Sequence, residues 1–124
     1  MQNYNSKSKS DLRQRCYQFS LNIFALLDTL PNKRSSWVIG DQLLRSATSI
    51  GANLIEGRAS ASRLEFKKFY EIALKSANET QYWLSLLRDA KIIEARLVEP
   101  LLAETIELSK MLATGVIRLK QRIL

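Results

Sequence analysis

The chain of 124 residues contains no histidine and a single cysteine. Without histidine, no Ser-His or Cys-His pair can activate a nucleophile. The same scarcity removes almost every zinc or iron site built from imidazole and thiolate ligands, and leaves only a carboxylate metal site open. The one thiol, Cys16, cannot form a disulfide within the chain. Its position among apolar residues at helical spacing predicts a small buried side chain rather than a reactive thiol.

Long apolar runs are also missing. The longest uncharged segment, Cys16 to Leu27, is interrupted by polar side chains, so no stretch of roughly 20 apolar residues is available to cross a membrane. The N-terminus lacks the apolar core of a secretory signal, which predicts a cytoplasmic location. Residues 1–9 are polar and predict a flexible arm, while residues 10–124 have the length of a single domain.

Apolar residues instead recur at steps of three and four, which is typical of amphipathic helices. Ser10 is an expected N-cap, Ser62 with Glu65 matches a capping box, and Gly57 is expected to end a helix in the left-handed conformation. No alternation typical of strands is present. These signals predict an all-α, up-down-up-down four-helix bundle. The expected helices cover residues 10–30, 36–55 and 62–90, and a last helix that begins near 94 or at Pro100.

The second expected helix carries small residues where large ones are usual, from Arg45 to Gly57. Gly51 lies within it and costs roughly 1 kcal/mol relative to alanine, which predicts close packing of a neighbouring helix. Asn53, Glu56 and, on the next helix, Glu79 lie beside this face. Two carboxylates there could bind a cation or perform acid-base chemistry, but a structural polar network that fixes helix register is the favoured interpretation, with no catalytic and no metal site.

Positive charge is the feature of the composition that suggests a partner. The formal net charge is +7, and residues 1–75 hold twelve Lys or Arg against six Asp or Glu. A basic surface attracts nucleic acid without reading its sequence, although it can also serve solubility alone. The candidate nucleic-acid-binding residues are Arg45, Arg58, Arg63, Lys67, Lys68 and Lys75, extended by the tail residues Arg118, Lys120 and Arg122 if the topology brings them to the same end.

Four aromatic side chains flank the apolar stripes. They could stack on bases, but aromatic residues at helical spacing are more often core or subunit contacts, so their number favours an oligomer. The residues are Trp37, Tyr70, Tyr82 and Trp83.

The segment from Arg45 to Gly57, then Glu65-Phe66 and the segment from Ile72 to Thr80, resemble the 23S rRNA intervening-sequence protein family of four-helix bundle proteins. The resemblance extends over nearly the whole chain after residue 9. Position 51 is often proline in that family and is glycine here, and Pro100 differs from the family's usual start of the fourth helix.

The resemblance implies a left-handed up-down bundle that assembles into a homopentamer and has no enzymatic activity or cofactor. A related branch serves diversity-generating retroelements as an accessory protein that binds reverse transcriptase and nucleic acid. Three functions are therefore open: a basic oligomer that binds RNA or DNA, which is favoured, an adaptor that docks a protein such as a reverse transcriptase, and an unrecognised enzyme.

Overall fold

The computed structural model contains four α-helices joined by short turns. It describes the backbone of residues 4–123 and the side chains of residues 12–121. No strand occurs among the described residues, and the predicted all-α class is confirmed. The helices are α1 (Tyr4–Leu27), α2 (Arg34–Arg58), α3 (Arg63–Asp89) and α4 (Ala95–Ile123).

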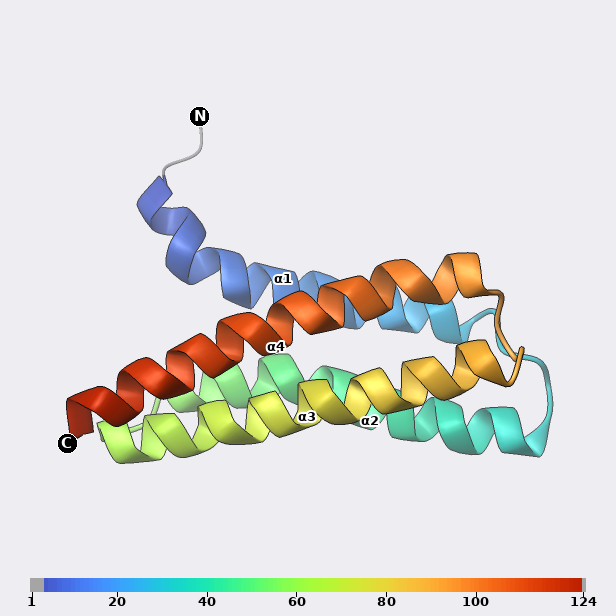
Figure 1. Ribbon diagram of the computed structural model, residues 1–124. Coiled ribbons are helices and arrows are strands. Elements are labelled where there is room, and N and C mark those ends of the chain that lie inside the picture. The colour runs from blue at the N-terminus through green and yellow to red at the C-terminus, as the bar shows by residue number, and fades with distance from the viewer. Residues whose placement is uncertain (1–3, 124) are drawn as a thin grey trace.

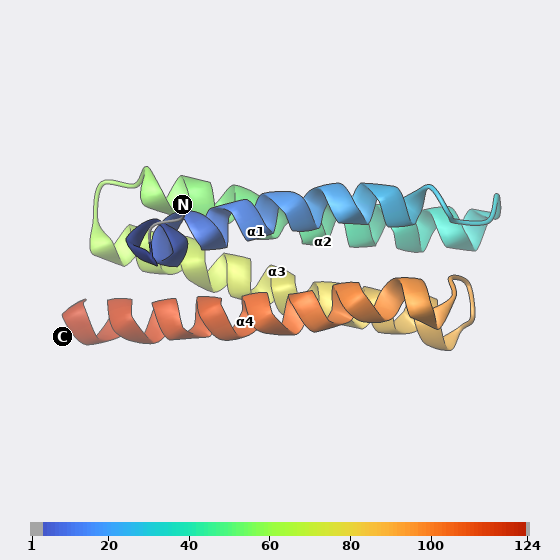
Figure 2. The ribbon, with the colours of Figure 1, turned by 90° about the horizontal axis from the view of Figure 1, so that it is seen from above.

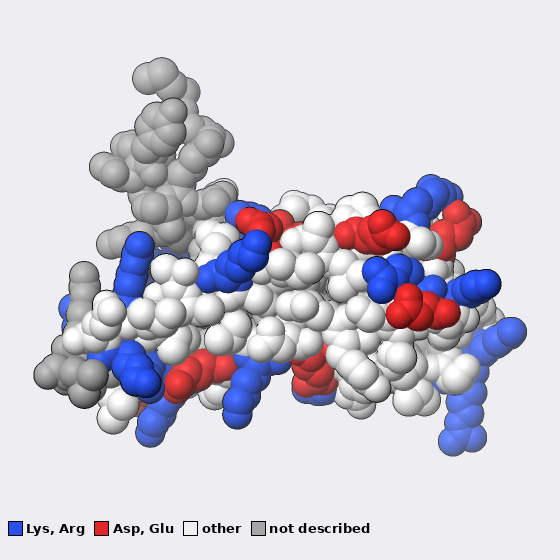
Figure 3. Space-filling view, viewed as in Figure 1, with Lys and Arg blue, Asp and Glu red and all other residues white. Residues whose placement is uncertain are grey.

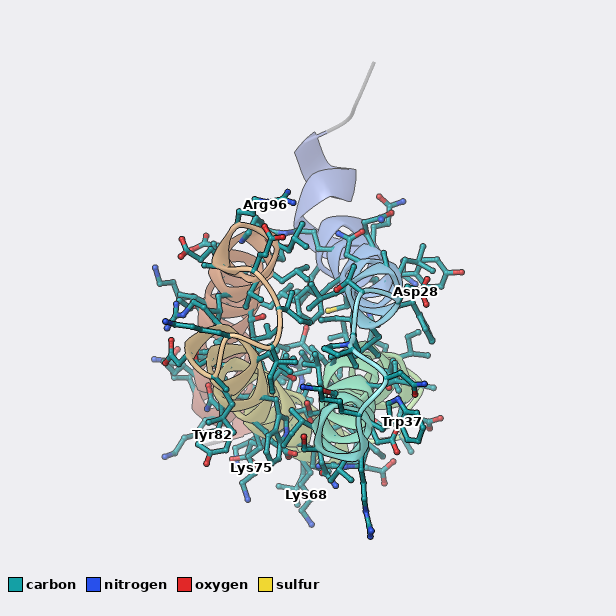
Figure 4. All side chains as sticks on the ribbon, turned by 90° about the vertical axis from the view of Figure 1, so that its right-hand side faces the viewer. Asp28, Trp37, Lys68, Lys75, Tyr82 and Arg96 are labelled. Atoms are coloured by element: carbon teal, nitrogen blue, oxygen red, sulfur yellow. The ribbon has the colours of Figure 1, made fainter. Side chains whose placement is uncertain are left out.

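Each helix packs against its neighbours in the chain, and α4 closes the bundle against α1. Consecutive helices run in opposite directions, so the α1–α2 and α3–α4 turns share one end and the α2–α3 turn lies at the other (Figure 1). Seen from above, α1 with α2 and α4 with α3 form two layers (Figure 2). Viewed along the axis, the four helices follow one another in the predicted left-handed order (Figure 4).

The apolar stripes meet in one core, as their spacing predicts. Large side chains from every helix are fully buried there, and each contributes about 1.5–3 kcal/mol relative to an exposed position. None of the described helices offers an apolar stretch long enough to span a bilayer. The largest apolar side chains of this core are Phe19, Ile23, Leu43, Ile50, Leu54, Leu84, Leu87, Leu108, Leu112 and Val98.

Helix α1 differs from its predicted bounds at both ends. It begins at Tyr4, so Ser10 lies inside the helix and is not its N-cap, since residues 4–9 contain no proline or glycine that would stop the helix. It ends at Leu27 because Thr29 closes the last turn through its hydroxyl, which donates to the carbonyl of Leu26 at 2.7 Å. The independent mobility of residues 1–9 stays a prediction, and residues 1–3 lie outside the described part.

Two glycines of α2 act through close packing. A Cβ added at Gly51 would lie 3.2 Å from the Cβ of Cys16, which confirms the predicted close contact with another helix, here α1. The prediction for Gly57 is wrong, because α2 continues to Arg58 and no described glycine has a positive φ. A Cβ at Gly57 would lie 3.0 Å from the Cβ of Phe69, so this glycine lets α3 approach α2.

The second half of the chain follows the prediction more closely. The hydroxyl of Ser62 accepts a hydrogen bond from the Glu65 amide at 3.1 Å, which confirms Ser62 as the N-cap of α3. Helix α4 begins at Ala95, so the alternative start at Pro100 is excluded and this proline lies inside the helix. The α3–α4 turn contains Lys91 in the left-handed conformation, with φ of 59°.

Candidate nucleic-acid interface

The antiparallel topology gathers three helix ends that carry positive charge. The C-terminus of α2, the N-terminus of α3 and the C-terminus of α4 lie at the same end of the molecule (Figure 1). The topology therefore brings the tail of α4 to the same end as the α2–α3 turn, which was the condition for including the tail residues in the candidate surface. We call this surface the basic end and define it by Arg58, Arg63, Lys67, Lys68, Arg118 and Lys120.

Carboxylates neutralise little of the basic end. The same segments hold three acidic residues, Glu56, Glu65 and Glu71, against six cations. The amino group of Lys67 lies 3.5 Å from the carboxylate of Glu71. No ion pair with a described residue is made by Arg63, Lys68, Arg118 or Lys120. In the space-filling view, Lys and Arg predominate near the left-hand end, and the two signs are interleaved near the right-hand end (Figure 3). This end therefore carries an excess of positive charge.

Tyr70 links the basic end to the core. Burial raises the pKa of its hydroxyl, and the nearby positive charge of Arg58 partly opposes that shift. Its ring packs edge-on against Phe66, with the centroids 5.1 Å apart. On α4 the ring occupies the space that a side chain would need at Gly115. The contacts of Tyr70 thus connect α3 to α4 behind the exposed cations.

Two predicted cations lie further along the bundle. Lys75 is exposed and points away from the bundle on the same side as Lys68 (Figure 4). Arg45 forms an ion pair with Glu79 on α3 and lies outside the basic end. The side chain of Arg122 lies outside the described residues.

The three residues predicted to form a polar network occupy different environments. Asn53 donates to the carbonyl and to the hydroxyl of Ser49, both at 2.8 Å. Glu79 instead accepts from Arg45 and from the indole of Trp83. The side chain of Glu56 is exposed and makes no hydrogen bond or ion pair within the described part of the chain. Asn53 and Glu79 thus belong to two separate groups, and Glu56 to neither.

Hydroxyl groups, which the sequence interpretation missed, form hydrogen bonds between α2 and α3. Ser76 donates to Ser49 at 2.9 Å, and Thr80 donates to Ser46 at 2.9 Å. Thr80 and Ser46 are fully buried. The serines among the small residues of α2 could have predicted polar contacts on this face. Which residues of α3 they meet depends on how the two helices pack.

Cys16 lies in the core, as predicted. Burial raises the pKa of its thiol to about 12, and the carboxylate of Glu104 adds to the rise. At neutral pH the thiol therefore stays protonated and is a poor nucleophile.

The predicted aromatic residues divide into two kinds. Trp37 and Tyr82 are 55% and 59% exposed, whereas Tyr70 and Trp83 are half-buried. Trp37 and Tyr82 point to different sides of the bundle (Figure 4). Neither exposed ring lies at the basic end.

A groove lies between α1 and α4. Its two adjoining parts have volumes of about 300 and 290 Å³ and share Asn22, Pro100 and Leu101. The charged residues at its edge, Arg15 and Glu104, pair with each other at 2.6 Å. Neither part is lined by Glu56 or Glu79. Among the described residues, no group of His, Cys, Asp and Glu could hold a metal ion.

The 23S rRNA-intervening sequence protein family model matches residues 8–114. The chain belongs to this family. A crystal structure of a protein of unknown function from the S23 ribosomal protein family of Bacteroides thetaiotaomicron has 36% sequence identity and a TM-score of 0.79. The alignment covers 85% of this chain and 97% of that protein. No curated protein matches the chain.

The family match divides the basic end. Arg58, Arg63, Lys67 and Lys68 lie within the matched residues, whereas Arg118 and Lys120 follow the last matched position. The α2–α3 part of the surface thus belongs to the family domain, and the last turns of α4 add charge beyond it.

Proposed function

We propose that this family member is a non-catalytic, self-associating bundle that binds RNA or DNA through its basic end, without strong sequence specificity. The observation that carries the proposal is the convergence of six cations from three helices on one surface with three carboxylates. Lysine and arginine that neutralise phosphates release counterions from the nucleic acid, so such a surface binds a polyanion irrespective of base sequence.

Salt dependence tests the nucleic-acid part directly. Binding of a labelled single-stranded RNA and a duplex DNA to the full chain is measured by filter retention at increasing salt. The expected result is a steep linear fall of log affinity with log salt, by about 0.7 per phosphate contact for a single strand and about 0.9 for duplex DNA. Absence of binding at low salt contradicts the proposal.

Exposed apolar side chains support self-association. Tyr17, Leu21 and Phe24 follow one another at helical spacing on α1 and are 45–70% exposed, and this stripe continues to Asp28. On α3, Tyr82 and Leu86 are exposed and lie four residues apart. Asp28 points to a different side of the bundle from Tyr82 and Lys75 (Figure 4).

Each of these two apolar surfaces can cover the other in a contact between copies. Because the two surfaces lie on different sides, pairing them between copies is a head-to-tail contact, which gives closed rings when the rotation closes. A ring multiplies the number of basic ends. The count of five subunits and the cytoplasmic location remain predictions.

Sedimentation of the wild-type chain and of two variants tests this contact. Phe24→Glu should shift an oligomer toward the monomer, whereas Ile106→Glu, at a similarly exposed position on α4, should not. A wild-type monomer at micromolar concentration contradicts self-association. In that case the same apolar surfaces favour the adaptor function, and capture of a purified reverse transcriptase after nuclease treatment distinguishes it.

A further inference from the structure

Arg45 and Glu79 form an ion pair between α2 and α3 that lies beyond the basic end. The Nη2 atom of Arg45 donates to Oε2 of Glu79 and also to Oε1 of Gln42, the latter at 3.0 Å. The indole Nε1 of Trp83 donates to the same Oε2 atom at 2.8 Å. One carboxylate oxygen therefore accepts from both Arg45 and Trp83.

This pair continues a line of cations along α3. Lys68, Lys75 and Glu79 are separated by seven and four residues, spacings that place them near one side of a helix. Lys68 and Lys75 point away from the bundle on that side (Figure 4). From Lys68 to Glu79 the rise along the axis is about 16 Å. A polyanion that extends from the basic end over these lysines reaches Arg45 next.

The ion pair is exposed enough for an outside anion to compete. The side chain of Arg45 is 58% exposed and that of Glu79 is 35% exposed. Water screens such a pair strongly, so little free energy holds Arg45 against Glu79. A phosphate offers several acceptor oxygens, and the planar guanidinium can bind two of them at once. Exchange of the carboxylate for phosphate is therefore a low-cost step.

We propose that Glu79 is an internal competitor for phosphate at Arg45. In the free protein the carboxylate of Glu79 forms an ion pair with Arg45. When a polyanion lies over Lys68 and Lys75, Arg45 leaves Glu79 and binds phosphate, while the indole of Trp83 remains beside a carboxylate that has lost its cation. This inference rests on the proposed nucleic-acid binding and adds to it a phosphate-binding residue and a carboxylate that sets the affinity.

The decisive variant is Glu79→Gln, because the amide keeps an acceptor for Trp83 and removes the negative charge. Glu107→Gln is the matched control, since Glu107 also lies beside a cation, Lys110, at 3.5 Å. The dissociation constant for a labelled oligothymidylate is measured for both. We expect about fivefold tighter binding for Glu79→Gln, equivalent to about 1 kcal/mol, and less than half of that gain in free energy for the control.

A double-mutant cycle separates competition at Arg45 from general electrostatics. In an Arg45→Gln background, Glu79→Gln should no longer tighten binding. The inference is overturned if the two glutamate variants bind equally, or if the gain persists without Arg45. Those results leave wild-type binding intact, whereas a wild type that shows no salt-dependent binding removes the proposed function itself.

Fluorescence provides a readout that a merely structural ion pair does not give. The chain has two tryptophans, so Trp37→Phe leaves Trp83 as the single reporter. Inorganic polyphosphate is the probe because it has no bases to quench emission. Its addition should change Trp83 emission, and Arg45→Gln should abolish the change. An emission that does not respond to bound polyphosphate contradicts the exchange.

Discussion

The two ends of the bundle carry similar numbers of cations but differ in how these are neutralised. At the end formed by the α1–α2 and α3–α4 turns, which we call the mixed end, Arg88 lies 2.9 Å from Asp89 and Arg96 lies 2.7 Å from Glu94. At the basic end, most cations have no carboxylate partner among the described residues. The mixed end comprises Lys33, Arg34, Arg88, Lys91 and Arg96, with Asp28, Asp89, Glu94 and Glu99.

This difference shows that the net charge of the whole chain, +7, does not describe the charge of either end. Five cations face four carboxylates at the mixed end, and six face three at the basic end. The closer balance of charge at the mixed end, where two of the five cations form ion pairs, leaves less long-range field than the excess at the basic end. The arrangement of charge, rather than its amount, therefore distinguishes the two ends.

The largest expected effect comes from removing matched charges at each end. Replacing two arginines and two lysines of the basic end by glutamine should lower the slope of log affinity against log salt by about 3 for single-stranded RNA. The same number and kind of substitutions at the mixed end should change the slope by less than 1. Filter binding at several salt concentrations measures both. The sets are Arg63, Lys68, Arg118, Lys120 and Lys33, Arg34, Lys91, Arg96.

Equal losses from both sets would contradict the comparison, since they would mean that only total charge matters. Circular dichroism of both variants checks that the bundle is intact. A set restricted to Arg118 and Lys120, which follow the family match, then measures how much this chain adds to the family domain.

Local signals in the sequence were sufficient for some of these features. The cap at Ser62 was predictable because the accepting hydroxyl and the donating amide of Glu65 are three residues apart. Gly57 was misinterpreted because a glycine near a helix end serves either a left-handed turn or close packing, and Phe69, which decides between them, is on another helix.

The charged surface was predictable only in part for the same reason. The basic segments were visible, and the antiparallel topology determined which of them meet. The pairing of Arg45 with Glu79 required the register between α2 and α3, which buried hydroxyls such as Ser46 and Thr80 help to fix. Spacing within one helix contains no information on that register.

Alkaline pH should weaken the bundle through Cys16, which influences Tyr70 at the basic end. The thiol has a pKa of about 12 in the folded protein, above its ordinary value of 9.0. Below pH 9.0 both states keep the proton, so no stability is lost there. As pH rises toward 12, the unfolded thiol ionises first, and the free energy of unfolding falls by up to about 1.4 kcal/mol per pH unit.

Urea unfolding of wild type and Cys16→Ala over this pH range measures the effect. The alanine variant keeps the Cβ that packs against Gly51 and removes the titrating group. Its stability should fall less steeply than that of the wild type. Parallel curves would show that Cys16 does not contribute to the alkaline loss.

Replacing a glycine by alanine should change the free energy of unfolding in opposite directions at the two ends. At Gly115, near the basic end, an added Cβ meets the Tyr70 ring, 2.6 Å from Cδ2, so Gly115→Ala should destabilise the fold by about 1–2 kcal/mol. At Gly40, toward the mixed end, the obstructing atom is a terminal methyl of Leu30, which can rotate away. Gly40→Ala should therefore gain up to about 1 kcal/mol of helix propensity. Thermal unfolding measures both, and equal signs contradict this account.

The smallest effect should distinguish the turns themselves. Lys91, in the α3–α4 turn of the mixed end, has φ of 59°, a left-handed conformation that suits glycine better than lysine. Lys91→Gly should raise the free energy of unfolding by about 0.5–1 kcal/mol. Ala59, which ends α2 at the basic end, has φ of −87° in the right-handed helical region, so Ala59→Gly should lower it by a similar amount. If denaturant unfolding shows that both glycines destabilise, the strain at Lys91 is offset by contacts of its side chain.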